Sequence, residues 1–355
     1  MPKIIGNVEL YMGPHQTGAF DNLEETIVDF INAAQSRLEV AVQELDSPQI
    51  AEALIRARQR KVTVKVVTEH NYLRESRPVR QPDRPGGRYE TNRDLHASLL
   101  RANIDVKTDY NTNIFHQKFI VRDRQSLLTG STNFTETGTS KNLNHIVIVH
   151  DSEVAKIYAR EFREISQGRF GKLSKGHDRT PKDVIVSGIP IRVLFAPDHN
   201  PEMEIMKQMA KAKKSIDFAI FTFSNSSGID DQMLLIRRLN MPMRGAMDFK
   251  QGVQKWAATD RLVNAGVEIY TVRPSRTIGN LHHKLMVLDE QVMIAGSFNY
   301  TGPANKLNDE NIIILGDLDS TENDSIELQK EMAGYALQEI NRIMDTFGER
   351  HSANE

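Results

Sequence analysis

The stretch HQKFIVRDRQSLLTGSTNFT, residues 116–135, occurs a second time as HHKLMVLDEQVMIAGSFNYT at residues 282–301. The copies align without a gap at a constant offset of 166 residues, the difference between 282 and 116. A repeat retained only for packing would match in its apolar positions, but here the matched residues are mostly polar and able to do chemistry. The matched pairs are His116 with His282, Lys118 with Lys284, Asp123 with Asp289, Gly130 with Gly296, Ser131 with Ser297, and Asn133 with Asn299.

The repetition extends outward from this stretch to most of the chain. Each half begins with an apolar strand that ends in proline, at 8–14 and at 191–197. Alternating strand and helix patterns follow, which predict an α/β lobe with a mixed sheet flanked by helices. Helices are expected at about 22–35, 48–59, 200–213, 229–239 and 319–347, and strands at RLEVAVQEL, VTVKVVT, SIDFAIFTF and, more weakly, near Met243.

The chain divides into an N-terminal lobe (1–165), a linker (166–185) and a C-terminal lobe (186–355). The linker is assigned because residues 166–183 are rich in Gly, Lys and Arg and lack periodicity. Two similar lobes related by a pseudo-two-fold axis are expected to share one active site, so no oligomer is required to complete it.

Composition indicates an ordinary soluble globular protein, with 39% hydrophobic and 26% charged residues. The formal net charge is -2, so attraction to nucleic acid must come from local basic patches. Cysteine is absent, which excludes disulfides and thiolate metal sites. The N-terminus does not resemble a signal peptide, and no apolar run is long enough to span a membrane. A cytoplasmic location is therefore expected.

The repeated residue types suit a phosphodiester substrate. Residues i and i+2 of a strand share a face, so each histidine and the lysine two positions later are expected to point the same way. One neutral imidazole can attack phosphorus while the other, protonated, donates to the leaving oxygen. The lysines, together with the Ser131, Ser297, Asn133 and Asn299 side chains, would hold the phosphate oxygens. No metal-ligand spacing is present, so neither a metal nor another cofactor is expected.

With its two H-x-K-x(4)-D motifs, the sequence resembles the phospholipase D superfamily. The resemblance covers both halves and nearly the whole chain. It implies two similar α/β lobes around one shared site and a two-step reaction through a phosphohistidine. It also implies that Asp123 and Asp289 are structural supports rather than groups that touch the substrate.

The copies stop matching at one informative position, where the offset aligns Asn144 with Glu310. The superfamily usually has an acidic or amide residue here, hydrogen-bonded to a catalytic histidine. In two-lobed relatives such as tyrosyl-DNA phosphodiesterase, this pairing crosses between the lobes. The resemblance therefore implies that Glu310 pairs with His116 and Asn144 with His282. A carboxylate favours the cationic imidazole that forms on attack, so we expect His116 to be the nucleophile and His282 the general acid.

The fold does not determine the substrate, because the superfamily includes nucleases, phospholipases and phosphatidyltransferases. Arginine-rich segments before each motif could follow a polyanionic backbone, which favours DNA or RNA as the substrate and partner. A phospholipid substrate is the alternative, although neither segment offers an apolar surface and no stable membrane association is expected. A non-catalytic nucleic-acid-binding module is the third possibility. The arginines are Arg74, Arg77, Arg80, Arg84 and Arg88 in the first half and Arg273 and Arg276 in the second.

Overall fold

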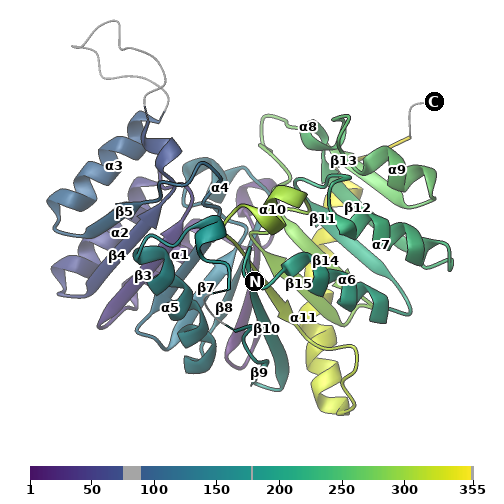
Figure 1. Ribbon diagram of the computed structural model, residues 1–355, viewed down its shortest axis with the longest axis horizontal. Coiled ribbons are helices and arrows are strands. Elements are labelled where there is room, and N and C mark those ends of the chain that lie inside the picture. Colours follow the sequence, from purple (N-terminus) through teal and green to yellow (C-terminus); the bar gives the residue numbers. More distant parts are fainter. Residues whose placement is uncertain (75–88, 177–178, 353–355) are drawn as a thin grey trace, which may run out of the picture.

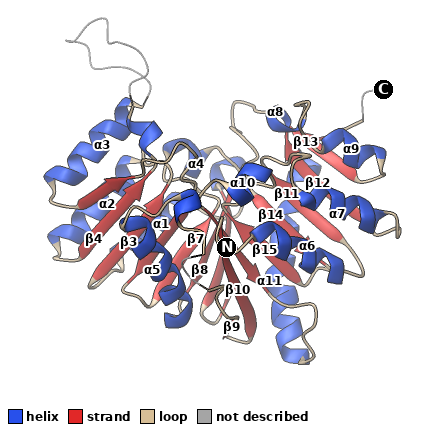
Figure 2. Cartoon of the chain, in the orientation of Figure 1, coloured by secondary structure: helices blue, strands red, loops and turns tan. Residues whose placement is uncertain are grey.

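The computed structural model describes residues 1–74, 89–176 and 179–352. It contains two mixed sheets, one built from each half of the chain (Figures 1 and 2). The strand order of the first is β1-β2-β8-β7-β6-β3-β4-β5, and that of the second is β9-β10-β16-β15-β14-β11-β12-β13-β17. Apart from the added edge strand β17, the two orders are equivalent. The expected α/β fold of two similar lobes is confirmed.

The elements of the first half run from β1 to α5. Its strands are β1 (Lys3–Ile5), β2 (Val8–Gly13), β3 (Arg37–Val42), β4 (Thr63–Thr68), β5 (Asp105–Thr108), β6 (Lys118–Arg122), β7 (Ser126–Gly130) and β8 (Asn144–Val149). Its helices are η1 (His15–Thr17), α1 (Leu23–Asn32), α2 (Pro48–Gln59), η2 (His70–Leu73), α3 (Glu90–Arg101), α4 (Glu136–Ser140) and α5 (Ser152–Ser166). Strands β3, β4 and β5 are parallel, and the other pairings are antiparallel.

The second half repeats this order. Its strands are β9 (Val184–Val186), β10 (Ile189–Ala196), β11 (Ile216–Ile220), β12 (Met243–Asp248), β13 (Glu268–Val272), β14 (Lys284–Leu288), β15 (Val292–Gly296), β16 (Glu310–Leu315) and β17 (Gly348–Arg350). Its helices are η3 (Gly171–Leu173), α6 (Pro201–Lys211), α7 (Gly228–Arg237), α8 (Phe249–Gly252), α9 (Thr259–Asn264), α10 (Gly302–Lys306) and α11 (Asn323–Phe347).

The largest hydrophobic cluster lies between the lobes and contains residues of both sheets and of helices α5 and α11. Tyr158 of α5 is an example: its ring packs edge-on against Phe119 of the first sheet and against Phe195 of the second, with centroids 5.1 and 5.0 Å away. Two further clusters cover the outer faces, beneath α1–α3 on one side and α6, α7 and α9 on the other (Figure 1). The shared core fixes the lobes against each other.

Local sequence explains where several of these elements begin and turn. Helix α2 starts after Ser47, whose hydroxyl accepts the Ile50 N–H, and proline occupies its first position. The connection between β6 and β7 is formed by residues 123–125 and places Asp123 and Arg124 at φ 55° and 56°, the left-handed region that both central residues of a type I′ turn adopt. Equivalent residues turn the chain between β14 and β15.

Most predicted elements are present, with differences at their boundaries. The weak strand near Met243 is a regular central strand, β12, and the last helix begins at residue 323 rather than 319. Helix α5 and edge strands β1, β9 and β17 were missed. Part of the segment assigned as a linker packs against the core, because Phe170 is buried and the Gly171 N–H donates to Asp309. Within the described ranges, we find no helix with the length and apolar character needed to cross a bilayer.

Candidate active site

Both H-x-K motifs lie at the edge of their sheets where the parallel strands end. Lys118 opens β6 opposite Val42, the last residue of β3. In the same way, Lys284 opens β14 opposite the last residue of β11. The histidines therefore precede the strands instead of lying on them. They lie in extended segments that pair with the opposite lobe. Their positions are set by contacts between lobes, which the strand pattern alone did not predict.

One of these contacts is a short pairing of residues 115–117 with residues 309–311, here called the His116 ladder. The His116 N–H donates to the Asp309 carbonyl at 2.9 Å. The side chain of His116 contacts the next residue of the same segment: its Nδ1 lies 2.6 Å from a carboxylate oxygen of Glu310. Glu310 is fully buried, and His116 is 6% exposed. The predicted pairing of the N-terminal histidine with the C-terminal lobe's acid is present.

The second contact pairs residues 143–145 with residues 281–283, and we call it the His282 ladder. Its backbone hydrogen bond runs from the His282 N–H to the Leu143 carbonyl at 2.9 Å. His282 Nδ1 lies 2.9 Å from Asn144 Oδ1, so the predicted crossing pair is present here too. Each histidine is thus held through Nδ1 by the opposite lobe, and a serine backbone, that of Ser297 for His116 and of Ser131 for His282, also contacts each ring.

Two buried serines hold the partners of the histidines. The Ser131 hydroxyl donates to Asn144 Oδ1 at 2.7 Å, and the Ser297 hydroxyl donates to Glu310 at 2.7 Å. Asn144 Nδ2 donates to the Gly138 carbonyl at 2.9 Å, which leaves the amide oxygen directed at the histidine. A hydroxyl has one hydrogen to donate. While these bonds persist, the serines orient the histidine partners and do not donate to phosphate oxygens.

The two lysines are buried and similarly held. The Nζ of each donates to the carbonyl of the histidine two residues earlier, at 2.8 Å in both motifs. Lys118 also donates to Gln43 Oε1 at 3.1 Å, whereas Lys284 lies over the ring of Phe221, 4.8 Å from its centroid. Gln43 and Phe221 follow β3 and β11 at equivalent positions. The site is therefore symmetric in its motif residues and asymmetric in their surroundings.

Burial and mutual charge shift the ionisation of this group. Burial lowers the pKa of Lys118 to about 7, against the opposing effect of Glu310. Burial, with the charge of Lys118, also lowers the pKa of Lys284. Burial raises the pKa of Glu310 to about 8. Ionisable groups whose pKa values are shifted in this way are common at functional sites.

The histidines are electrostatically coupled across the lobes. Burial lowers the pKa of His116 well below its usual value, and the charges of Lys118, Lys284 and His282 lower it further. Burial and the same two lysines lower the pKa of His282. The two motifs lie close together because the hydrogen bonds of His116 with Glu310 and of His282 with Asn144 both cross between the lobes.

The remaining predicted site residues lie at different distances from this centre. Asp123 and Asp289 are at the far ends of β6 and β14, where their carboxylates accept backbone N–H groups of residues 35–37 and 213–215. This placement agrees with a supporting role. Asn133 and Asn299 follow the serines in each half, and within the described chain the side-chain oxygens of both are buried without a hydrogen-bond partner.

The arginines are only partly placed. Arg77, Arg80, Arg84 and Arg88 lie outside the described residues. Arg74 and Arg276 are exposed. Arg273 pairs with Glu349 at 2.9 Å and stacks over Phe249 at 3.4 Å, so its guanidinium is already engaged.

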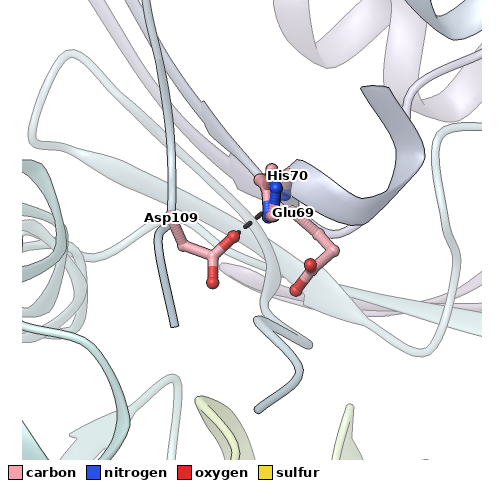
Figure 3. Close-up of side chains that lie close together, drawn as sticks. All are labelled: Glu69, His70 and Asp109. Carbon is pink, nitrogen blue, oxygen red and sulfur yellow. Dashed lines mark hydrogen bonds between the residues drawn. The ribbon is translucent and has the colours of Figure 1, made fainter. Parts of the chain in front are cut away.

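The structure also brings together acidic groups that the sequence spacing did not reveal. Glu69, His70 and Asp109 lie close enough to share an ion (Figure 3). The Glu69 carboxylate accepts the N–H groups of Asn71 and Phe115, and the Asp109 carboxylate accepts those of His70 and Asn111. These bonds brace the loop that leads into His116. A second group contains Glu161, Glu164 and Asp198.

Comparison with known proteins identifies the family. The family described as "Cardiolipin synthase, PLD-like domain" matches residues 27–166 and 205–332, which together form most of the chain and contain both motifs. The chain belongs to the phospholipase D superfamily. Similar curated proteins carry the names cardiolipin hydrolase and phospholipase D.

The curated relatives are similar over part of their length. A mitochondrial cardiolipin hydrolase of Xenopus laevis is 31% identical over 152 residues, which cover 43% of this chain and 63% of that protein. A phospholipase D of Rickettsia felis is 29% identical over 136 residues, or 38% of this chain and 60% of that protein. The chain thus spans about three fifths of these relatives.

A solved structure resembles the whole chain. The phosphatidylserine synthase of Haemophilus influenzae superposes with a TM-score of 0.66 over 99% of this chain and 89% of that protein, at 12% identity. At this identity the likeness concerns the fold alone.

The lowered lysine pKa values predict how anion binding depends on pH. A nearby oxyanion favours the charged form of a lysine over the neutral form, so Lys118 should take up a proton when the anion binds. The affinity for the anion should therefore fall as pH rises above about 7. The fall should approach about tenfold per pH unit for each proton taken up. Calorimetric titration with tungstate, in buffers of different ionisation enthalpy, measures both quantities.

Lys118→Met should weaken tungstate binding and remove that lysine's proton uptake. Lys156→Met provides the control, because this lysine is exposed on α5 and ion-paired with Glu153. Affinity that stays constant between pH 6 and 9, with no buffer dependence, contradicts the prediction.

Proposed function

We propose that the enzyme is a nuclease that cleaves DNA or RNA through a covalent phosphohistidine, with no metal required for the chemical steps. The observation that supports a polyanionic substrate is the segment 74–88, which carries five arginines and two acidic residues. Tyr72, two residues before this segment, lies beside the site, because Gln43 donates to its hydroxyl at 3.0 Å and accepts from Lys118. Basic segments of this kind follow nucleic-acid backbones.

The proposed reaction uses only the chain's own groups. The Nε2 lone pair of His116 attacks phosphorus and forms a P–N bond while the bond from phosphorus to the leaving oxygen breaks. His282, protonated at Nε2, gives its proton to that oxygen. Neutral His282 then takes a proton from water, whose oxygen attacks phosphorus and releases His116. Lys118 and Lys284 neutralise the phosphate oxygens, which is the role a metal would otherwise have.

A phospholipid is the second candidate substrate, and the names of the relatives favour it. The similar proteins include a cardiolipin hydrolase and a phospholipase D, and the superposable structure is a phosphatidylserine synthase. The same two histidines and two lysines would serve either substrate, since both present one phosphodiester to the site.

A single panel of substrates tests both proposals. The enzyme is incubated in EDTA with labelled single-stranded DNA, duplex DNA, RNA, and vesicles of phosphatidylcholine or cardiolipin, and His116→Ala protein serves as the blank for contaminants. We expect cleavage of nucleic acid to persist in EDTA. Cleavage of vesicles alone establishes the lipid activity instead. Activity that vanishes with chelator and returns only with a divalent ion contradicts the two-histidine mechanism.

A further inference from the structure

The His116 and His282 ladders each contain a second side-chain contact, one residue beyond the catalytic pair. In the His282 ladder, the Nδ1 atoms of His145 and His283 lie 3.1 Å apart. In the His116 ladder, Asn311 Nδ2 donates to Gln117 Oε1 at 2.7 Å. The offset of 166 relates Gln117 to His283 and His145 to Asn311. Equivalent positions thus hold an imidazole pair in one ladder and an amide pair in the other.

One backbone group determines where the protons of the imidazole pair lie. The Gly296 N–H donates to His145 Nε2 at 3.2 Å, so that nitrogen is an acceptor. Neutral His145 then carries its hydrogen on Nδ1 and donates it to His283 Nδ1. His283 in turn carries its hydrogen on Nε2, which faces Glu339 at 3.7 Å. The two rings are nearly parallel, at 5°, and both are fully buried.

A further proton has no favourable place in this chain of bonds. It could bind only His145 Nε2 or His283 Nδ1, and each of these already faces an N–H donor. Burial and the nearby charge of Lys284 lower the pKa of both rings. Glu339 opposes this effect at His283, while Arg342, which pairs with Glu339, adds positive charge. The pair is therefore neutral and hydrogen-bonded at neutral pH, and acid disrupts it.

The amide pair of the other ladder cannot titrate. Asn311 Oδ1 accepts hydrogen bonds from the Thr129 hydroxyl at 2.9 Å and the Tyr158 hydroxyl at 3.2 Å. Neither Asn311 nor Gln117 changes charge with pH. The chain therefore contains its own pH-insensitive version of the same contact.

We propose that His145 and His283 are positioning residues that hold His282 in register for proton transfer. They are the chain neighbours of Asn144 and His282, so a shift in their contact displaces the catalytic pair beside them. A misplacement of about 1 Å can cost about 10²-fold in rate. The inference rests on the general-acid role proposed for His282, and the test separates the two.

The test compares two esters of methyl phosphate, whose leaving groups are phenolate and 4-nitrophenolate. The nitrophenolate needs little protonation. In His283→Ala, the release of phenolate in the first turnover should slow about 10- to 100-fold with little change in substrate affinity, while the release of 4-nitrophenolate in the first turnover should slow less than about threefold. Gln117→Ala is the matched control in the His116 ladder, and it should lower the cleavage rates of both esters by the same factor.

The double variant His145→Asn, His283→Gln copies the amide pair into the His282 ladder. It should recover most of the rate lost in His283→Ala. It should also lose less kcat in acid than the parent, because the contribution of the imidazole pair, which is lost as pH falls through its lowered pKa, is absent and only the protonation of His116 remains. The variant further guards against a His283→Ala protein that does not fold.

Three outcomes are decisive. Equal losses on both esters in His283→Ala overturn the positioning role, and so does a double variant that keeps the parent's acid limb. A reversed pattern, in which Gln117→Ala and not His283→Ala discriminates between the esters, retains positioning by the second contacts and overturns the roles assigned to His116 and His282.

Discussion

His116→Ala is expected to abolish turnover of every phosphodiester substrate, by about 10⁵-fold or more, because it removes the proposed nucleophile. His282→Ala should behave differently with a good leaving group. A nitrophenolate ester needs little protonation, so bond cleavage should continue, while the second step lacks its general base. The His282→Ala enzyme should therefore release about one equivalent of nitrophenolate quickly and accumulate phosphohistidine. On the natural substrate it should lose about 10²- to 10⁴-fold.

Rapid-quench measurement of nitrophenolate and mass analysis of the trapped peptide check this prediction. The two histidines lie far apart in sequence, so the labelled peptide identifies the attacking residue. His15→Ala is a suitable control, since His15 is exposed on η1 and outside the active site. A burst and a phosphopeptide in His116→Ala, with His282→Ala inactive, would reverse the roles and leave the shared site intact.

The crossing pairs could be predicted because one offset relates the two halves and the resemblance to the phospholipase D superfamily implied that the pairing crosses between the lobes. That offset placed Asn144 and Glu310 in equivalent positions, and the hydrogen bonds at 2.9 and 2.6 Å follow the predicted pairing. The sheet order of each half also repeats, because equivalent strands carry equivalent patterns. In this protein the internal repeat is the strongest source of structural information.

Other features could not be read from the repeat. The contact between His145 and His283 was missed because its equivalent, Asn311 with Gln117, uses a different chemistry, so the alignment showed no match. The contacts of the Glu69 and Asp109 carboxylates were also missed, because these carboxylates accept backbone N–H groups of loops that are distant in sequence. Helix α5 was missed as well, although Asp151 caps its first turn by accepting two N–H groups. The side-chain contacts depend on three-dimensional proximity rather than on spacing, whereas the cap of α5 is a local signal that the sequence carries.

Exchanging the two histidine partners is expected to exchange the two catalytic roles. Glu310→Gln keeps an oxygen that can accept from His116 but removes the carboxyl group, whose ionised form stabilises the imidazolium formed on attack. Loss of a buried carboxylate from such a pair costs about 10⁴-fold in a serine protease, and we expect about 10³- to 10⁴-fold here. Asn144→Asp is isosteric and gives His282 a carboxylate partner, which should raise its pKa and weaken it as an acid.

The double variant Glu310→Gln, Asn144→Asp should therefore carry the phosphoryl group on His282 instead of His116. The site can accommodate the exchange, because each partner is held by an equivalent serine, Ser131 or Ser297, at 2.7 Å. Trapping with the 4-nitrophenyl ester followed by peptide mass analysis identifies the modified residue, and thermal melting checks that the fold persists when the Gly138 carbonyl loses its amide donor. A phosphohistidine that remains at His116 in the double variant would show that another asymmetry of the site selects the nucleophile. The nearest such differences are Gln43 beside Lys118 and Phe221 beside Lys284.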